Sequence, residues 1–340
     1  MFKIIELKDE KVWENFLKKK EIDFFPFFQS WDWGEVQKKS GFDILRFGIF
    51  DKHAELAGVF LIVDINARRG HYLHMRHGPV LSSFKDKCFD AIINFVKEIA
   101  KERNTSFIRI SPLIKNEDIK DDFFKKRGFI NAPVHNMDAQ NCWILDITKP
   151  EDQLLKEMRK THRYLIRKAQ TMDIKIIRSK NLSYLDSFLN LYNDLSKRKG
   201  FVPHRGIREE FEILSKNDEA ILIMAEYEKK IISAALIVFT GDMAIYHHGV
   251  SADEYKNIPA SYLIQWEAIK EAKNRGKKIY NFWGIVPIDE PNHPWKGITL
   301  FKTGFGGERR DFIHAKDLPL NIWYWKSYLI EYIAKIKKGY

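Results

Sequence analysis

The chain carries the sequence WKGITLFKTGFGGE at residues 295–308. Lys302 stands between the apolar residues Phe301 and Phe305, so we expect its charge at the edge of a core rather than free in water. The glycines that follow it permit turns or a close approach of the backbone. A cation held beside such a backbone can stabilise a developing negative charge. The alternative interpretation is the start of a strand, with Lys302 extending its charge to solvent.

A similar sequence pattern in the first half of the chain predicts the fold. Phe301-Lys302 with Gly304-Phe305 matches Phe124-Lys125 with Gly128-Phe129. Each copy follows the same order of a strand, a long helix and a second strand, over residues 80–107 and 250–279. An internal duplication of about 150 residues is the simplest explanation. We therefore predict an α+β fold of two tandem acyl-CoA N-acyltransferase (GNAT)-like domains, at residues 1–147 and 148–316.

The composition of the chain indicates what kind of partner it binds and in which cellular compartment it is found. The chain has 57 Lys and Arg against 46 Asp and Glu, a net charge of +11. This balance favours a polyanionic partner such as nucleic acid, a phosphorylated substrate or an anionic membrane surface. Cys88 and Cys142 have no paired spacing, which indicates buried thiols in a reducing compartment. The sequence shows no signal peptide and no stretch long enough to span a membrane, so we expect a cytoplasmic protein.

One segment concentrates basic charge. Residues 152–172 are predicted to form the longest helix of the chain, with an apolar face and a strongly basic one. Lys160, Arg163 and Arg167 belong to the basic face. Such a face can lie on phosphates, and a solvated basic surface is the alternative.

Two aromatic segments have two interpretations each. Trp31 and Trp33 lie close to exposed lysines, so they either form a ligand wall or anchor the core beneath a basic helix end. Residues 317–340 predict a helix with an aromatic stripe and a lysine-rich end. This helix either packs against a domain or contacts a membrane surface.

Four ordered motifs resemble one family. They are QSWDWGEV at residues 29–36, RHGPV at 76–80, THRYLIRKA at 161–169 and LFKTGFGG at 300–307. They resemble the FemABX family of tRNA-dependent aminoacyltransferases, which build peptidoglycan interpeptide bridges. The resemblance spans nearly the whole chain and implies two GNAT-like domains, with residues 317–340 returning to the first. Residues 209–218 are too short for the coiled-coil insertion of some members, so the chain resembles the compact ones.

The resemblance also implies site residues. Lys302 matches the lysine thought to stabilise the transferring acyl group, and Arg205 resembles the arginine that holds the precursor's diphosphate. The basic position after the first tryptophan motif falls at Gln37 or Lys38, with Trp31 and Trp33 beside it. A carboxylate that some relatives carry at the end of a strand is replaced here by Ser111, so no general base carries over.

The implied reaction moves an aminoacyl group from the 3′ ester of a tRNA to an amine on a stem peptide. An ester is already activated, so we expect no cofactor and no metal. The expected partners are an aminoacyl-tRNA and a UDP-linked or lipid-linked muropeptide precursor, with a possible peripheral contact at the inner face of the membrane. The basic residues Lys160, Arg163 and Arg167 are the expected tRNA contacts.

Two other classes of function remain open from the sequence. A CoA-dependent N-acyltransferase needs a glycine-rich turn that opens a helix and cradles the pyrophosphate. Residues 256–261 of the second repeat contain no glycine, and Pro259 removes a donor there. A non-catalytic RNA-binding or membrane-binding relative of the fold is the third class. The position of Lys302, in a groove or on an open face, discriminates it from an enzyme.

Overall fold

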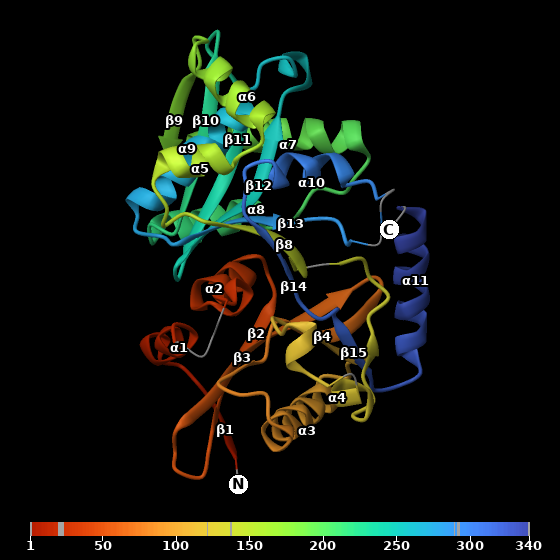
Figure 1. The fold of residues 1–340 in the computed structure, drawn as a ribbon. Coiled ribbons are helices and arrows are strands. Elements are labelled where there is room, and N and C mark those ends of the chain that lie inside the picture. The colour runs from red at the N-terminus through yellow and green to blue at the C-terminus, as the bar shows by residue number, and fades with distance from the viewer. Residues whose placement is uncertain are drawn as a thin grey trace. The chain divides into compact units, whose positions relative to one another are not determined.

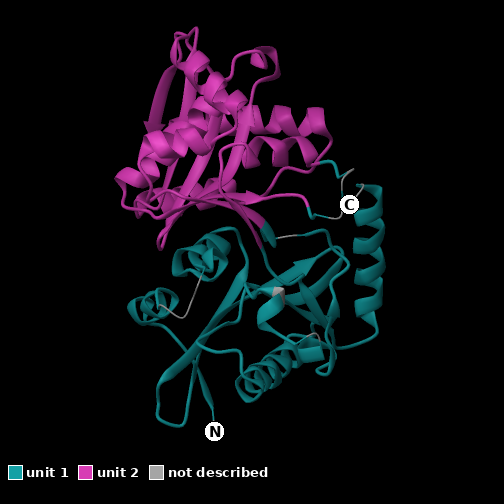
Figure 2. Ribbon diagram, viewed as in Figure 1, with its two compact units in different colours: residues 1–141, 287–294, 311–340 teal, residues 142–286, 295–310 magenta. Residues whose placement is uncertain are grey.

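The computed structural model divides into two compact units (Figures 1 and 2), and it describes residues 2–19, 24–120, 122–136, 138–288, 290 and 293–338. Unit 1 comprises Met1–Asn141, Pro287–Pro294 and Asp311–Tyr340. Unit 2 comprises Cys142–Val286 and Trp295–Arg310. Each unit has its own sheet and its own hydrophobic core.

Unit 1 is built on a sheet with the strand order β1-β2-β3-β4-β6-β15-β7, and β5 pairs with β3. The strands are β1 (Lys3–Glu6), β2 (Asp43–Phe50), β3 (Leu56–Ala67), β4 (Gly70–His77), β5 (Val80–Leu81), β6 (Phe107–Pro112), β7 (Ile130–Asn131) and β15 (Lys316–Pro319). The helices are α1 (Glu10–Leu17), α2 (Trp31–Lys39), α3 (Asp86–Glu102), α4 (Asp122–Lys125) and α11 (Trp323–Lys337). Short 3-10 turns cover Phe27–Gln29 and Asn116–Asp118.

Unit 2 is built on a sheet with the strand order β14-β8-β13-β12-β11-β10-β9. The strands are β8 (Asn141–Asp146), β9 (Lys175–Ser179), β10 (Ala220–Tyr227), β11 (Lys230–Thr240), β12 (Met243–Ser251), β13 (Ile279–Gly284) and β14 (Glu308–Asp311). The helices are α5 (Glu151–Glu157), α6 (Lys160–Gln170), α7 (Leu182–Lys199), α8 (Ile207–Lys216), α9 (Ala260–Asn274) and α10 (Lys296–Thr303). A 3-10 turn covers Asp253–Tyr255.

The predicted repeat is visible in the topology. In unit 1 the parallel pair β4 and β6 is connected through α3, and in unit 2 the parallel pair β12 and β13 is connected through α9. The apolar face of α3, with Phe89, Ile92 and Val96, packs into the core of unit 1. The α+β fold class predicted from the sequence is confirmed. Cys88 and Cys142 are both buried thiols, as predicted.

The boundaries of the two units differ from the predicted domain boundaries, which lay after residues 147 and 316. Strand β8, expected in the first domain, pairs antiparallel with β13 in the sheet of unit 2. Residues 311–316, expected in the second domain, belong to unit 1, where β15 pairs with both β6 and β7. Backbone pairing therefore sets these boundaries, and the sequence pattern does not reveal it.

The prediction of one helix over residues 152–172 is wrong, because the segment forms α5 and α6 with a break between them. Met158 and Arg159 adopt extended conformations, and the Arg159 amide donates to the Gly304 carbonyl at 2.9 Å. The Arg163 guanidinium donates to the carbonyls of Lys156 and Met158 at 2.8 Å each. The carbonyl groups at the end of α5 thus accept hydrogen bonds from a side chain of α6. The longest described helix is α7, with 18 residues.

A buried ionic network attaches the C-terminal segment to unit 1. Arg109 in β6 is 1% exposed and donates from Nε and Nη2 to both carboxylate oxygens of Asp317, each at 2.7 Å. The same guanidinium donates to Glu331 in α11 at 2.6 and 3.2 Å. Burial lowers the pKa of Arg109, but its bonds with the two carboxylates outweigh burial and raise it above its usual value. One cation therefore connects β6, β15 and α11.

None of the helices in the described ranges combines the length and the apolar character needed to cross a membrane.

We expect Arg109→Leu to lower the free energy of unfolding by about 3–5 kcal/mol, because it leaves two buried carboxylates without their cation. Urea denaturation measures the change. Arg103→Leu is the control, since Arg103 bonds Asp64 and Asp43 in a more exposed position and should cost about 1 kcal/mol or less. Equal losses in the two variants would contradict the role of the network.

Candidate active site

Lys302 lies in the last turn of α10 and is buried, with 6% of its surface exposed. Its Nζ donates a hydrogen bond to the Gly284 carbonyl at 2.6 Å, where β13 ends. The Tyr246 ring lies with its centroid 6.0 Å from the same nitrogen. Burial lowers the pKa of Lys302 to about 7, because the charged form loses its hydration. The amine can therefore be protonated or neutral near pH 7.

Helix α10 is joined to the start of α6 by several polar contacts. His162 Nε2 bonds the Phe301 carbonyl at 2.9 Å, and burial lowers the pKa of His162, so the neutral ring donates this bond. The Arg159 guanidinium donates to the Leu300 carbonyl at 3.0 Å and to the Thr303 hydroxyl at 2.9 Å. The basic helix and the helix of Lys302 consequently form one local assembly.

Residue 304 must be a glycine in this assembly, because there is no space for a side chain at this position. A Cβ at this position would lie 1.9 Å from Cε1 of His162. The glycine-rich stretch thus permits a close approach, as predicted, and the neighbour it admits is the His162 ring. Gly306 and Gly307 adopt positive φ angles of 84° and 95°, which most side chains avoid, and lead into β14.

A buried carboxylate lies between two histidines next to the Lys302 site. His247 Nδ1 bonds Glu210 Oε1 at 2.6 Å, and His248 Nε2 bonds the other carboxylate oxygen at 3.2 Å. Burial raises the pKa of Glu210, but the charges of the two histidines outweigh burial and hold it well below its usual range. The three side chains offer ligand atoms within 4.8 Å of one another, a spacing compatible with a metal ion. Hydrogen bonds between the same atoms account for the arrangement.

A β-bulge brings both histidines to this carboxylate. The register between β11 and β12 shifts so that Leu236 faces His248 while Ile237 faces Tyr246, which leaves His247 as the extra residue. Neighbouring strand residues normally point to opposite faces, and a bulge removes that alternation. The His247 ring packs 5.1 Å from the ring of Trp283, the residue before Gly284. The cluster therefore adjoins the carbonyl that holds Lys302.

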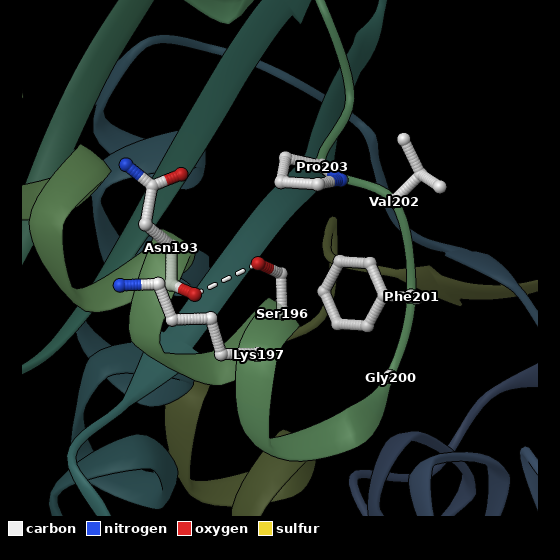
Figure 3. A pocket seen from close by; sticks show the side chains of 7 residues that line it. All are labelled: Asn193, Ser196, Lys197, Gly200, Phe201, Val202 and Pro203. Carbon is white, nitrogen blue, oxygen red and sulfur yellow. Dashed lines mark hydrogen bonds between the residues drawn. The ribbon is translucent and has the colours of Figure 1, made fainter.

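The loop that carries Arg205 is anchored to the same cluster. The His204 ring lies 6.4 Å from the ring of Tyr192 and 5.7 Å from that of His248. Arg205 itself is exposed. Residues before it line an open pocket of about 490 Å³, formed by Asn193, Ser196, Lys197, Gly200, Phe201, Val202 and Pro203. Figure 3 shows the Phe201 ring on the inner side of the loop, next to Ser196.

The predicted tRNA contacts differ in their surroundings. Lys160 and Arg167 are exposed on α6. Arg163 is half-buried, and its guanidinium is engaged with carbonyls at the end of α5. Lys125, the counterpart of Lys302 in the first repeat, is exposed in α4. Burial thus distinguishes Lys302 from Lys125, although the two lysines occupy matching positions in the sequence pattern.

The predicted substrate residues of the first repeat lie on α2. Trp33 is 6% exposed and packs on Phe28 with ring centroids 4.7 Å apart, so it belongs to the core. Trp31 is half-buried, with the Arg46 guanidinium 3.8 Å above its ring. Gln37 is half-buried as well, whereas Lys38 is exposed and bonds Glu35 at 3.1 Å. Trp33 therefore cannot serve as an exposed ligand wall.

One buried polar group in unit 1 was missed from the sequence. The Asp138 carboxylate accepts hydrogen bonds from Ser111 Oγ at 2.8 Å and from Arg76 Nε at 2.7 Å. Burial raises the pKa of Asp138, but Arg76 and the nearby histidines hold it well below its usual range. A carboxylate from a loop thus reaches Ser111, where no acidic residue stands in the strand. A loop aspartate has no periodicity that would have revealed it.

Comparison with known proteins shows relatives across the chain. The FemAB family model matches residues 9–146, 125–207 and 204–331. A lipid II:glycine glycyltransferase of Staphylococcus epidermidis is 19% identical, over 85% of this chain and 86% of that protein. The aminoacyltransferase FemA of Staphylococcus aureus is 28% identical over 26% of this chain and 21% of that protein.

Solved structures support the same architecture. The crystal structure of FemX superposes with a TM-score of 0.81 at 18% identity, covering 97% of this chain and all of that chain. A tandem GNAT protein from the clavulanic acid biosynthesis pathway gives a TM-score of 0.59 at 9% identity, covering 94% of this chain and 98% of that one. At these identities the likeness concerns the fold, and it confirms the predicted tandem GNAT-like architecture.

We expect Gly304→Ala to cost about 1–3 kcal/mol of stability, because the new methyl group must displace the His162 ring. Thermal or urea unfolding measures the loss. Gly297→Ala in the same helix is the matched control, since a Cβ there meets nothing within 4 Å, and should change stability by less than about 1 kcal/mol. Adding His162→Ala should recover part of the loss at residue 304, and the absence of any recovery would contradict the steric explanation.

Proposed function

Because this chain belongs to the FemAB family, we propose that it transfers an amino acid from an aminoacyl-tRNA to the stem peptide of a peptidoglycan precursor. The observation that carries the proposal is Lys302, a buried amine with a pKa of about 7 held at the end of β13. Relatives named for transfer of glycine to lipid II cover most of the chain, which favours a lipid-linked acceptor. Both substrates would then meet at the cytoplasmic face of the membrane.

The proposed chemistry requires one proton to change place. The acceptor amine attacks the ester carbonyl carbon, an N–C bond forms and the carbonyl oxygen gains negative charge. The bond to the ribose 3′ oxygen then breaks and leaves an amide. Protonated Lys302 stabilises the oxyanion, gives a proton to the leaving oxygen and regains one from the attacking nitrogen. A pKa near 7 suits both proton transfers, because neither direction is strongly uphill.

Substrate binding is assigned to two surfaces of unit 2. We assign the donor's phosphates to the exposed basic residues of α6, because contacts of Arg159 and His162 join this helix to α10, the helix of Lys302. Arg205 is assigned to the precursor's diphosphate, because the ring of its neighbour His204 packs near the rings of Tyr192 and His248. Gln37 and Lys38 belong to unit 1, and their contribution to precursor binding is proposed separately, with Trp31 beside them.

The CoA-dependent alternative finds no support in the second repeat. The turn before α9 contains Pro259 at the N-cap and no glycine at residues 256–261, so a backbone cradle for a pyrophosphate is not evident there. A non-catalytic relative would have no need to bury an unpaired lysine charge, which lowers stability. Burial of Lys302 therefore favours a catalytic role.

Lys302→Met should lower the single-turnover rate of transfer by about 10²–10³-fold, the size seen for loss of one oxyanion donor. The loss should fall on kcat more than on KM, because the charge develops in the transition state. Lys302→Arg should restore little activity, since a planar guanidinium does not place its charge where an ammonium does. Lys125→Met, which changes the exposed counterpart, is the matched control and should transfer normally. Near-normal transfer by Lys302→Met would overturn the assignment.

The advantage of the wild type over Lys302→Met should depend on pH. Lys302 is protonated below its pKa of about 7 and neutral above it. If the charged form stabilises the oxyanion, the ratio of the two rates is largest below pH 7 and declines as the pH rises through 7. Taking the ratio removes the titration of the acceptor amine, which both proteins share. A ratio that is constant from pH 5.5 to 8.5 would exclude this role of the charge.

Arg205→Ala should weaken precursor binding by about 1.5–3 kcal/mol, the value of a hydrogen bond to a charged group, with little effect on the rate from the bound state. Titration calorimetry with the precursor measures the affinity. Arg208→Ala is the control, because Arg208 is nearby in sequence and already bonds Asp186. Unchanged affinity of Arg205→Ala would rule out the diphosphate contact.

Lys160→Glu combined with Arg167→Glu should weaken tRNA binding and flatten its salt dependence by about one unit of slope for each phosphate that the variant no longer binds. Arg163 is left unchanged because it satisfies the end of α5. Lys229→Glu with Lys230→Glu, at the turn between β10 and β11, is the charge-matched control. A fall in precursor affinity with tRNA affinity unchanged would assign α6 to the other substrate.

A further inference from the structure

Helix α11 has the reverse of the usual polarity for a surface helix. Its buried residues are Tyr324, Ser327 and Glu331, whose side chains all carry a polar group. The sides exposed to solvent carry Ile322, Trp323, Trp325, Leu329, Ile330, Tyr332, Ile333 and Ile336. Because a helix turns by about 100° per residue, Leu329 and Ile333 lie opposite Tyr324 and Glu331. The centre of the outward face is therefore apolar.

The ionic network of unit 1 explains this polarity. Glu331 is held by Arg109 at 2.6 Å, and Tyr324 donates its hydroxyl to Asp317 at 3.1 Å. These bonds fix which side of α11 faces the sheet, and Figure 1 shows the helix alongside the strands of unit 1. The apolar side is thus held outward by strong contacts on the opposite side, and rotating the helix to bury it would break the network.

The exposed charges on α11 are all positive. Lys326, Lys335, Lys337 and Lys338 lie on the helix or at its end. Glu331 is the acidic residue of the helix, and it is buried against Arg109. The exposed surface of α11 therefore combines tryptophan, tyrosine and aliphatic side chains with lysines. Tryptophan and tyrosine favour the boundary between lipid and water, and lysines at that depth favour anionic headgroups.

We propose that α11 is a docking surface for an anionic lipid bilayer. The helix has 15 residues and would extend about 22 Å, less than the roughly 30 Å core of a bilayer, so it would lie in the interface rather than span it. A second copy of the chain fits the surface less well, because a symmetric contact through this face would bring the lysines of both copies together. The proposal does not depend on the transfer reaction.

The test measures binding of the full chain to vesicles without any precursor or tRNA. Vesicles of phosphatidylglycerol with phosphatidylcholine should co-sediment with the protein, and added salt should weaken that binding. Vesicles of phosphatidylcholine alone should bind less. Leu329→Glu with Ile333→Glu should reduce binding to the anionic vesicles at least about tenfold, because both positions lie at the centre of the apolar face.

A matched control separates the surface from a general effect of charge. Ile5→Glu with Val12→Glu makes the same change at two exposed apolar residues elsewhere in unit 1, about 40% exposed each, and should bind as the wild type does. Circular dichroism confirms that each variant is folded. Trp325→Phe should remove part of the fluorescence blue shift on binding.

Three results would overturn the proposal. The first is a wild type that does not bind anionic vesicles, and the second is equal loss of binding in the α11 variant and the control. The third is a dimer in sedimentation velocity that Leu329→Glu dissociates while vesicle binding is unaffected, which would assign the face to a second copy.

Discussion

The buried guanidinium of Arg109 fixes the C-terminal end of the chain. It bonds a strand residue, Asp317, and a helix residue, Glu331, from within the sheet of unit 1. Strand β15 could not lie between β6 and β7 with a buried carboxylate unless a cation met it there. Such a network adds little net stability compared with apolar packing, but breaking it is costly. Its value lies in fixing one arrangement, including which side of α11 faces outward.

Lys302 is also a buried cation, but unlike Arg109 it is not paired with carboxylates in the part of the chain that the structure describes. No carboxylate contacts its Nζ among the described residues, and the Gly284 carbonyl accepts its hydrogen bond. Burial consequently lowers its pKa to about 7, whereas carboxylates keep Arg109 charged. Burial of a charge without a carboxylate costs stability that packing elsewhere must supply, and a pKa shifted in this way is compatible with the catalytic role proposed for Lys302.

The four sequence motifs pack against one another in two pairs, residues 29–36 with 76–80 and residues 161–169 with 300–307. In unit 1, Gln29 bonds the backbone of Leu61 and Arg76, and a Cβ at Gly78 would lie 2.7 Å from the Gln29 amide. In unit 2, His162 bonds the Phe301 carbonyl and occupies the space beside Gly304. Each pair combines a polar side chain with a glycine that makes room for it. Residues far apart in sequence are thereby held together.

The sequence by itself determined the fold class, the duplication and the family, because periodicity and ordered motifs are local properties. It also singled out Lys302 by its apolar neighbours. It did not determine the break between α5 and α6, since the extended residues Met158 and Arg159 depend on a bond to Gly304 from a distant segment. Nor could it find the Glu210 cluster, which needs a bulge in β12 and a helix from elsewhere.

Tertiary structure also decided between residues that the sequence presents alike. Lys125 and Lys302 occur in matching patterns, yet Lys125 is exposed, whereas Lys302 is buried and burial lowers its pKa. Trp33 and Trp31 are two positions apart, yet one is in the core and the other lies under a guanidinium. Local pattern gives the residue type and its spacing. Burial and the identity of the neighbour depend on segments far away in the chain, and these two properties set the charge state on which the proposed chemistry depends.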